Sequence, residues 1–383
     1  MGVMAEIHLL FHDGGGGHRN AATALREVMA REKPAWRVEL VHLQDLLDPL
    51  DLLRRLTGLR IQECYNALLR NGWTLGSTTL LRLLQGTIRL YHRPTVRLLE
   101  KYWRAHPADM AVSVVPHFNR ALREGFAAAA PGKPFVTILT DLADFSPHFW
   151  IEQQKQFLIC GTERAVEQAR ALGHDDAHIF RASGMILKPD FYAAPKTGRE
   201  ARRRELGLET DLPTAIVLFG GHGSKVMLEV AERLDSCGKK LQAIFICGRN
   251  ERLAARLRAR RWRIPVHIKG FTTTIFDDLR AADLFIGKPG PGSISESLAM
   301  GLPVIIECNS WTLPQERYNA TWVHENQVGI VLRTFRELDK AVAEMLQPER
   351  LAGFRERVAA QRNRAVFEIP EILERILALS RAS

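Results

Sequence analysis

The stretch Ile7-His-Leu-Leu-Phe-His-Asp-Gly-Gly-Gly-Gly-His18 sets the fold prediction. Its apolar run predicts a short buried strand, and its four glycines predict a loop. The same order of strand and glycine loop returns at Ala215-Ile-Val-Leu-Phe-Gly-Gly-His-Gly-Ser224. A helix is expected after each loop from apolar residues at helical spacing: Leu25, Val28 and Met29 in one case, and Val226, Val230 and Leu234 in the other. The two halves of the chain therefore begin alike.

Expected strands and helices alternate through both halves. The further strands are short apolar runs at residues 38–42, 110–115, 135–139, 243–247, 266–269, 284–287 and 303–307. Such alternation predicts parallel sheets covered by helices, so the fold class is α/β with two doubly wound, Rossmann-like domains. Open α/β sheets bind ligands outside the carboxyl ends of their strands. The ligand loops of both domains are therefore expected to face a shared cleft.

The length of 383 residues suits two domains of ordinary size. Residues 188–198 hold two prolines and a glycine without helical periodicity, which is typical of a linker. We therefore expect a first domain at residues 1–194 and a second at 195–365. Residues 366–383 are expected to form a terminal helix that packs back on the first domain through its apolar residues Ile372, Leu373, Ile376 and Leu377.

Composition and charge exclude several classes of protein. With 46% hydrophobic residues the chain is not disordered, and five separated cysteines indicate neither a disulfide framework nor a zinc ribbon. No apolar run approaches the roughly 18 residues that span a bilayer, and a secretory leader is not apparent. We therefore expect a reducing, cytoplasmic location. The net charge of +10 favours a polyanion, which leaves nucleic acid, an anionic membrane or a phosphorylated substrate open.

The first glycine loop does not fit the dinucleotide-binding fingerprint. The third glycine of G-x-G-x-x-G is replaced by Arg19 or Asn20, and no P-loop motif occurs. Gly16 and Gly17 still allow another molecule to approach the backbone, although a simple tight turn explains them too. His18 follows at a helix amino terminus, where the helix dipole disfavours the imidazolium form. His18 is therefore a candidate general base, with an ordinary structural histidine as the alternative.

A second glycine loop has the features of a phosphate site. Gly290, Gly292 and Ser293 offer backbone amides and a hydroxyl to a diphosphate at the start of a helix. Glu296, one turn later, can accept hydrogen bonds from both ribose hydroxyls, although helix capping also explains Ser293 and Glu296. Downstream, an amide and a carboxylate suited to sugar hydroxyls stand side by side at residues 315 and 316.

Taken in order, these motifs resemble the inverting GT-B glycosyltransferases of family 28. That family includes monogalactosyldiacylglycerol synthases, bacterial processive diacylglycerol glucosyltransferases and, more distantly, the peptidoglycan enzyme MurG. The resemblance covers nearly the whole chain. Its carriers are Gly14–Arg19 with Ala21 and Ala22, Thr140–Leu142, Cys247–Asn250, Ile264–Val266, Lys269–Phe271, Lys288–Gly292, Gly301–Pro303 and Gln315–Glu316.

The resemblance implies that UDP-glucose or UDP-galactose is the donor and is held by the second domain. It implies His18 as the base that activates the acceptor, with Asp141 as the competing candidate. The implied donor residues are Ile268 and Phe271 for uracil, Glu296 for ribose, Gly221, Gly290, Gly292 and Ser293 for the diphosphate, Gln315 and Glu316 for the sugar, and Arg249 without a more specific role. After the Thr140–Leu142 motif the plant members have histidine, proline and then tryptophan, whereas this chain has Ser146-Pro-His-Phe-Trp150 with one extra residue. His148 is an acceptor-side candidate that departs from this pattern. No D-x-D motif occurs, so neither a metal ion nor another cofactor is expected.

The acceptor is suggested by a basic stripe. Arg82, Arg89, Arg93 and Arg97, continued by Lys101 and Arg104, fall on one helical face, which resembles a membrane-surface segment. The apolar residues expected on the opposite face are Leu84, Ile88, Tyr91, Leu98 and Tyr102. An ordinary solvated helix is the alternative, and Pro94 can interrupt a continuous helix.

These observations favour an inverting UDP-sugar hexosyltransferase with a lipid acceptor, most simply diacylglycerol. We expect it on the cytoplasmic face of the cell membrane as a peripheral protein. The choice between glucose and galactose as the donor sugar is open. Another lipid or an isoprenoid is an alternative acceptor. A UDP-sugar epimerase of similar form is an alternative, whereas nucleic-acid binding is suggested by charge alone, without any recognised RNA or DNA motif.

Overall fold

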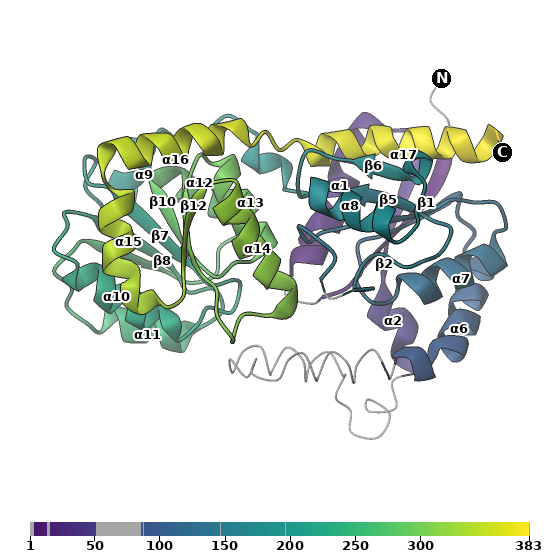
Figure 1. Ribbon diagram of the computed structural model, residues 1–383, viewed down its shortest axis with the longest axis horizontal. Helices are drawn as coiled ribbons and strands as arrows, with labels where there is room; N and C mark the ends of the chain where they lie inside the picture. Colours follow the sequence, from purple (N-terminus) through teal and green to yellow (C-terminus); the bar gives the residue numbers. More distant parts are fainter. Residues whose placement is uncertain are drawn as a thin grey trace. The chain divides into compact units, whose positions relative to one another are not determined.

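The computed structural model describes residues 4–13, 16–50, 86, 88–145, 147–195 and 197–382. The chain forms two compact units, shown in Figure 1. Unit 1 comprises Met1–Pro189 together with Asn363–Ser383, and unit 2 comprises Asp190–Arg362. The two units therefore divide after residues 189 and 362, whereas the domain boundaries were expected after residues 194 and 365.

Unit 1 is built on a six-stranded parallel sheet with strand order β2-β1-β3-β4-β5-β6. Helices cover both faces of the sheet. The strands are β1 (Ala5–Phe11), β2 (Trp36–His42), β3 (Met110–Ser113), β4 (Phe135–Ile138), β5 (Phe157–Cys160) and β6 (Ile179–Arg181). The helices are α1 (Gly17–Glu32), α2 (Leu43–Leu47), α6 (His92–Ala105), α7 (Asn119–Ala129), α8 (Glu163–Ala171) and α17 (Ala365–Ala382).

The C-terminal helix α17 belongs to unit 1, although the whole of unit 2 precedes it in sequence. Its apolar residues, among them Leu373 and Ile376, share one buried cluster with Ile7 of β1 and Leu25 of α1. The Lys33 Nζ to Glu374 Oε2 ion pair of 2.6 Å adds a polar contact. The helix begins at Ala365 and contains Pro370, five residues after its start. The helix therefore begins one residue before the expected range of 366–383.

Unit 2 repeats the architecture with a parallel sheet of order β12-β11-β10-β7-β8-β9. The strands are β7 (Thr214–Leu218), β8 (Gln242–Ile246), β9 (Val266–Lys269), β10 (Leu284–Gly287), β11 (Val304–Glu307) and β12 (Gly329–Leu332). The helices are α9 (Arg199–Glu205), α10 (Val226–Ser236), α11 (Glu251–Arg258), α12 (Ile275–Ala281), α13 (Pro291–Ala299), α14 (Pro314–Glu325), α15 (Leu338–Met345) and α16 (Pro348–Ala360). Its core cluster unites residues of β7, β8 and β10 with apolar faces of α10, α11 and α15. The predicted α/β class is thus confirmed in both halves.

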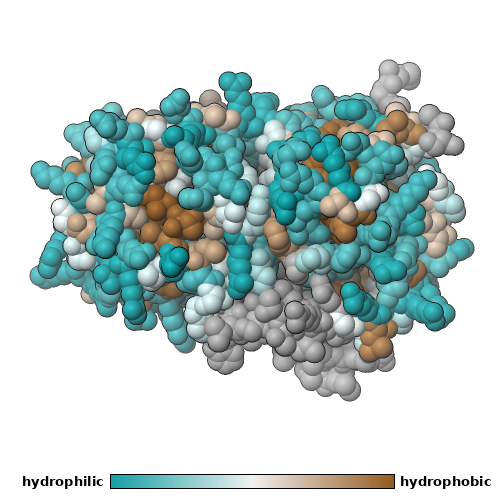
Figure 2. All heavy atoms as spheres, in the orientation of Figure 1, coloured by the Kyte–Doolittle hydropathy of each residue, from teal (hydrophilic) through white to brown (hydrophobic). Residues whose placement is uncertain are grey.

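Hydrophilic residues dominate the surface shown in Figure 2, with a compact hydrophobic area over the unit 2 sheet between α15 and α13. Among the described residues, no helix has both the length and the apolar character needed to cross a membrane.

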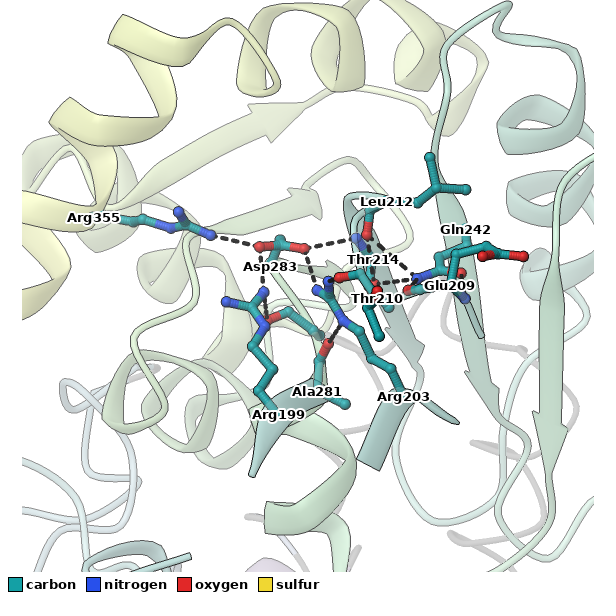
Figure 3. A network of polar contacts seen from close by, with 11 residues as sticks. Arg199, Arg203, Glu209, Thr210, Leu212, Thr214, Gln242, Ala281, Asp283 and Arg355 are labelled. Carbon is teal, nitrogen blue, oxygen red and sulfur yellow. Dashed lines mark hydrogen bonds and ion pairs between the residues drawn. The ribbon is translucent and has the colours of Figure 1, made fainter. Parts of the chain in front are cut away.

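The amino edge of the unit 2 sheet is held by a buried polar network centred on Asp283, directly before β10 (Figure 3). Asp283 Oδ2 accepts hydrogen bonds from Arg203 Nη2 at 2.6 Å and from the Thr214 backbone at 2.8 Å. Its Oδ1 pairs with Arg199 and with Arg355 Nη2, the latter at 2.7 Å. These contacts join α9, α16 and the first residues of β7 and β10. The network lies at the sheet edge opposite the expected ligand loops.

Candidate functional site

In unit 1, the loops that follow β1, β3 and β4 bring together residues from three parts of the sequence. Gly16 precedes α1 with φ 84°, a left-handed conformation that glycine adopts without steric cost. Gly17 begins the helix, and His18 is its second residue. Gly14 and Gly15, the first glycines of the loop, lie outside the described residues.

The His18 imidazole makes a specific contact with the end of β4. Its Nδ1 lies 2.9 Å from Thr140 Oγ1, and its ring stacks at a tilt on His12 with 4.3 Å between centroids. Burial lowers the pKa of His18 to about 4, against the opposing effect of the Val114 carbonyl. The ring is therefore neutral at pH 7, as a base requires. The leading cause is burial rather than the helix dipole that was expected from the sequence.

Trp150 connects His18 to the carboxylate of Asp141. Its indole Nε1 donates a 2.9 Å hydrogen bond to Asp141 Oδ2, and its ring centroid lies 5.7 Å from that of His18. Its backbone N–H donates to Asp144 Oδ1 at 2.7 Å. Burial raises the pKa of Asp144 to about 6, although the backbone hydrogen bonds that its carboxylate accepts oppose the shift. Asp141 is thus held by a buried indole beside the candidate base.

Two histidines in left-handed backbone conformations lie in the loops that support Trp150. His117 has φ 69° and His148 has φ 62°, which is uncommon for a residue with a side chain. The His117 backbone N–H donates to Phe149 O at 2.6 Å, and Asn119 Nδ2 donates to Trp150 O at 3.0 Å. Such local strain is maintained only where surrounding contacts enforce it. The His148 side chain is partly exposed, with Nδ1 3.9 Å from Glu152 Oε2.

The described part of the basic stripe lies on the exposed face of α6 and on the residues just before it, where Arg89 stands. Arg89, Arg93 and Arg97 are exposed, and Leu90 beside them is 79% exposed; Arg82 lies outside the described residues. The buried face of α6 consists of Thr95, Leu99 and Trp103. The expected apolar face was therefore wrong in detail, since its described members Ile88, Tyr91, Leu98 and Tyr102 are only partly buried. A turn at Tyr91 precedes α6, so the helix is interrupted there, three residues before Pro94.

In unit 2, the loops after β7, β8 and β9 meet at the carboxyl edge of the sheet. The Arg249 backbone N–H donates to Gly221 O at 2.9 Å, and its guanidinium lies 4.8 Å from the centre of the Phe271 ring. A Cβ on Gly248 would lie 2.3 Å from Gly221 O, so only glycine permits this approach. Ile268, in the adjoining strand β9, is partly buried. Four implied donor residues are thus placed along one edge.

The loop with the features of a phosphate site follows β10, which lies beside β7 in the same sheet. Gly290 is the N-cap of α13 and Pro291 its first residue, so Gly292 and Ser293 stand in the first turn. No atom lies within 4 Å of a Cβ placed on Gly292, so there is open space beside this residue. The positive end of the α13 dipole is suited to an anion at this loop. Glu296, partly exposed, follows in the same helix.

The first turn of α14 brings Gln315 and Glu316 beside this loop. Glu316 Oε1 pairs with Lys288 Nζ at 2.5 Å. Gln315 Oε1 is buried without a hydrogen-bond partner among the described residues, and the same is true of Asn319 Oδ1. Asn319 Nδ2 donates to Pro289 O at 2.8 Å. Lys288 and Asn319, which were not predicted as site residues from the sequence, thus join the candidate donor site.

Comparison with known proteins gives one family match. Residues 215–375 match the model of the glycosyltransferase family 28 C-terminal domain. Over 362 residues the chain is 28% identical to monogalactosyldiacylglycerol synthase 1, chloroplastic, of Arabidopsis thaliana. That match covers 90% of this chain and 65% of the relative, so the chain spans just under two thirds of the length of that relative.

Solved structures agree in fold. MurG of Acinetobacter baumannii matches with a TM-score of 0.59 at 12% identity, over 97% of this chain and 99% of that chain. A putative UDP-N-acetylglucosamine 2-epimerase from Listeria monocytogenes matches with a TM-score of 0.60 at 14% identity, over 95% and 92% of the two chains. The predicted GT-B fold class is confirmed. At these identities the likeness does not choose between transfer and epimerisation.

Proposed function

Since residues 215–375 belong to the glycosyltransferase family 28 C-terminal domain, we propose that this chain is an inverting UDP-sugar hexosyltransferase with a lipid acceptor. The observation that supports transfer most directly is a neutral, half-buried His18 held by Thr140 at the end of a glycine loop. The acceptor we propose is diacylglycerol, because the relative with 28% identity over 90% of this chain is named as a synthase of a diacylglycerol glycolipid.

The proposed step is a single displacement at the anomeric carbon. The acceptor hydroxyl oxygen forms a bond to that carbon while the bond to the UDP oxygen breaks, and His18 takes the hydroxyl proton. Thr140 orients the imidazole through its hydroxyl. Asp141, held by Trp150, adds a negative charge that favours the imidazolium as it forms.

The donor is proposed to bind along the carboxyl edge of the unit 2 sheet. The uracil lies near Ile268 and Phe271, the ribose on Glu296, and the diphosphate on the α13 loop. Lys288 and Arg249 supply positive charge there, together with the α13 dipole, so we propose that no metal or other cofactor is needed. Gln315 has a buried carbonyl oxygen without a partner, which suits a sugar hydroxyl.

The acceptor is proposed to reach unit 1 from an anionic membrane surface, on the inner face of the cell membrane. The exposed arginines of the α6 stripe and the exposed Leu90 support this placement. Basic residues attract anionic lipid, and an apolar side chain among them can enter the interface.

Product analysis tests the proposal. The full chain is incubated with diacylglycerol liposomes and with UDP-glucose or UDP-galactose in turn. A β-linked monoglycosyl lipid that forms from one of these α-linked donors, with one UDP released per lipid, is the expected result. UDP release or sugar isomerisation that proceeds equally without liposomes would instead favour the epimerase alternative, which the fold of the Listeria neighbour supports.

Replacing Glu296 with alanine is expected to weaken UDP binding. A charge-assisted hydrogen bond contributes about 1.5 to 3 kcal/mol, so the loss of one contact lowers affinity by roughly 10-fold to 150-fold. Calorimetric titration with UDP measures the change. Glu325→Ala, an exposed carboxylate at the end of α14, serves as the matched control. An unchanged UDP dissociation constant in folded Glu296→Ala protein would remove this residue from the donor site.

Replacing Arg89, Arg93 and Arg97 together with glutamine is expected to reduce binding to anionic liposomes. Each basic residue near such a surface contributes about 1 kcal/mol, so the partition coefficient should fall by roughly 100-fold at low salt. Vesicle sedimentation measures this. A triple glutamine variant of the exposed Arg252, Arg256 and Arg261 in unit 2 controls for net charge. Equal losses in the two variants would show a general charge effect and contradict a specific α6 surface.

A further inference from the structure

A cluster of ionisable side chains lies on the face of the unit 1 sheet that packs against α6. Glu6 and His8 stand two residues apart on β1, so they share one face, and the register of the parallel pair places His8 opposite Glu39 of β2. Each of the three offers one ligand atom, and these atoms lie within 4.8 Å of one another. Neither the donor site nor the His18 site uses these residues.

His8 is the unusual member of this cluster. It is only 1% exposed, and its Nδ1 is buried without a hydrogen-bond partner in the described part of the chain. Its Nε2 lies 3.7 Å from Glu39 Oε2, beyond a normal hydrogen bond. Burial lowers the pKa of His8, with His106 and Arg37 acting in the same direction and Glu39 opposing them. The buried His8 imidazole therefore turns its Nε2 toward Glu39, while its Nδ1 has no hydrogen-bond partner in the described part of the chain.

The neighbouring groups compensate the two carboxylates unequally. Arg37 Nε lies 3.5 Å from Glu6 Oε1, but this arginine is 81% exposed, and such surface pairs contribute little. From α6, the Tyr102 ring lies 5.9 Å from His8 and 4.6 Å from His106. Burial raises the pKa of Tyr102 to about 12, and the charge of Glu39 and a side-chain hydrogen bond to Glu39 add to the shift, so this neutral phenol is one partner of Glu39. A buried polar atom without a partner calls for an explanation such as an ion.

We propose that Glu6, His8 and Glu39 bind one divalent transition-metal ion of the zinc class, which holds β1 and β2 together. An imidazole nitrogen beside carboxylate oxygens favours such ions over magnesium or calcium. Zinc takes these ligands at about 2.0 to 2.2 Å, so small side-chain rotations bring the three donors onto one ion. Water completes the coordination from the exposed side of Glu39. This ion stabilises unit 1 and has no role in holding the diphosphate.

Cobalt and zinc titrations test the proposal on chelator-treated, full-length protein from which any affinity tag has been removed. We expect one saturable equivalent of Co²⁺ with a visible d–d absorption, its displacement by Zn²⁺, and a higher melting temperature with Zn²⁺. Glu6→Gln and Glu39→Gln should each weaken binding at least 10-fold. Glu27→Gln, an exposed carboxylate on α1, should bind as the unchanged protein does.

Circular dichroism confirms that each variant is folded before titration. The absence of a saturable cobalt spectrum would overturn the proposal. It would also be overturned if both glutamine variants bound as tightly as the unchanged protein. Loss of binding in His12→Ala with full binding in Glu39→Gln would move the ion to the histidines around His18 and contradict the site proposed here.

Discussion

Replacing His18 with alanine is expected to lower the rate of sugar transfer by about 10² to 10⁴, the usual contribution of a positioned general base. UDP affinity should stay unchanged, because the proposed donor contacts all belong to unit 2. Turnover under saturating UDP-sugar and liposomal diacylglycerol measures the first effect, and calorimetry measures the second. A large loss of transfer with intact UDP binding separates loss of the base from loss of the fold.

The pH dependence gives a second reading of the same base. Because burial lowers the pKa of His18 to about 4, the base should remain unprotonated across the neutral range and lose activity only as the pH falls toward that value. The acid limb of kcat/KM should therefore lie well below 6.5, the ordinary value of histidine. Circular dichroism over the same range controls for acid unfolding.

Asp141→Asn is the matched comparison for His18→Ala. It keeps the shape of the side chain and an oxygen for the Trp150 N–H, but it removes the negative charge. We expect a smaller loss than in His18→Ala if Asp141 only supports the imidazolium. Near-normal turnover in His18→Ala, with abolished turnover in folded Asp141→Asn, would move the base to Asp141 and refute the proposed step.

Much of the fold could be predicted because most strands are apolar runs next to glycine loops or helical patterns. Two of the three strands that were not predicted lack this support. β6 has three residues and ends in the exposed Arg181, and β12 begins with a glycine at the other edge of a sheet. Short strands of this kind depend on pairing with a neighbour that local sequence does not reveal. β5 carries the same signal as the predicted strands, since its apolar run precedes Gly161 and α8, and it was overlooked.

The candidate sites were predictable as motifs but not as contacts. Thr140 was part of a quoted motif, yet its hydrogen bond to His18 joins residues 122 positions apart. Lys288 likewise stands in the glycine motif, but its pair with Glu316 depends on how α14 packs beside β10. The neutral state of His18 was expected from the helix dipole. It results instead from burial, which depends on Trp150 and on the loop that contains His117. The sequence shows which residue types occur and at what spacing, whereas burial and long-range pairing arise only on folding.

Replacing Asp283 with asparagine is expected to destabilise the fold by about 3 to 5 kcal/mol, the usual cost of removing one partner from a buried ion pair. The carboxylate is 13% exposed and accepts from three arginines and the Thr214 backbone. Asparagine keeps one oxygen but removes the charge, so buried Arg203 loses its ionic partner. The network also joins α9 and α16 to the sheet, and its loss should lower the unfolding transition of unit 2. Chemical denaturation followed by tryptophan fluorescence and circular dichroism measures the change.

The difference in unfolding free energy between Asp283→Asn and the unchanged protein should depend on pH in one direction. Burial alone would raise the pKa of Asp283, but Arg199, the Thr214 N–H and Arg203 outweigh it and hold this pKa below its ordinary value of 3.8. The ionised carboxylate therefore stabilises the fold fully above that value, and this contribution is lost as the pH falls through the lower folded pKa. The stability gap should be constant near neutrality and should narrow only below about pH 4. Asp211→Asn, an exposed carboxylate near the same edge, is the control. An equal stability of Asp283→Asn and Asp211→Asn at pH 7 would show that the arginines find other partners and that the network does not depend on Asp283.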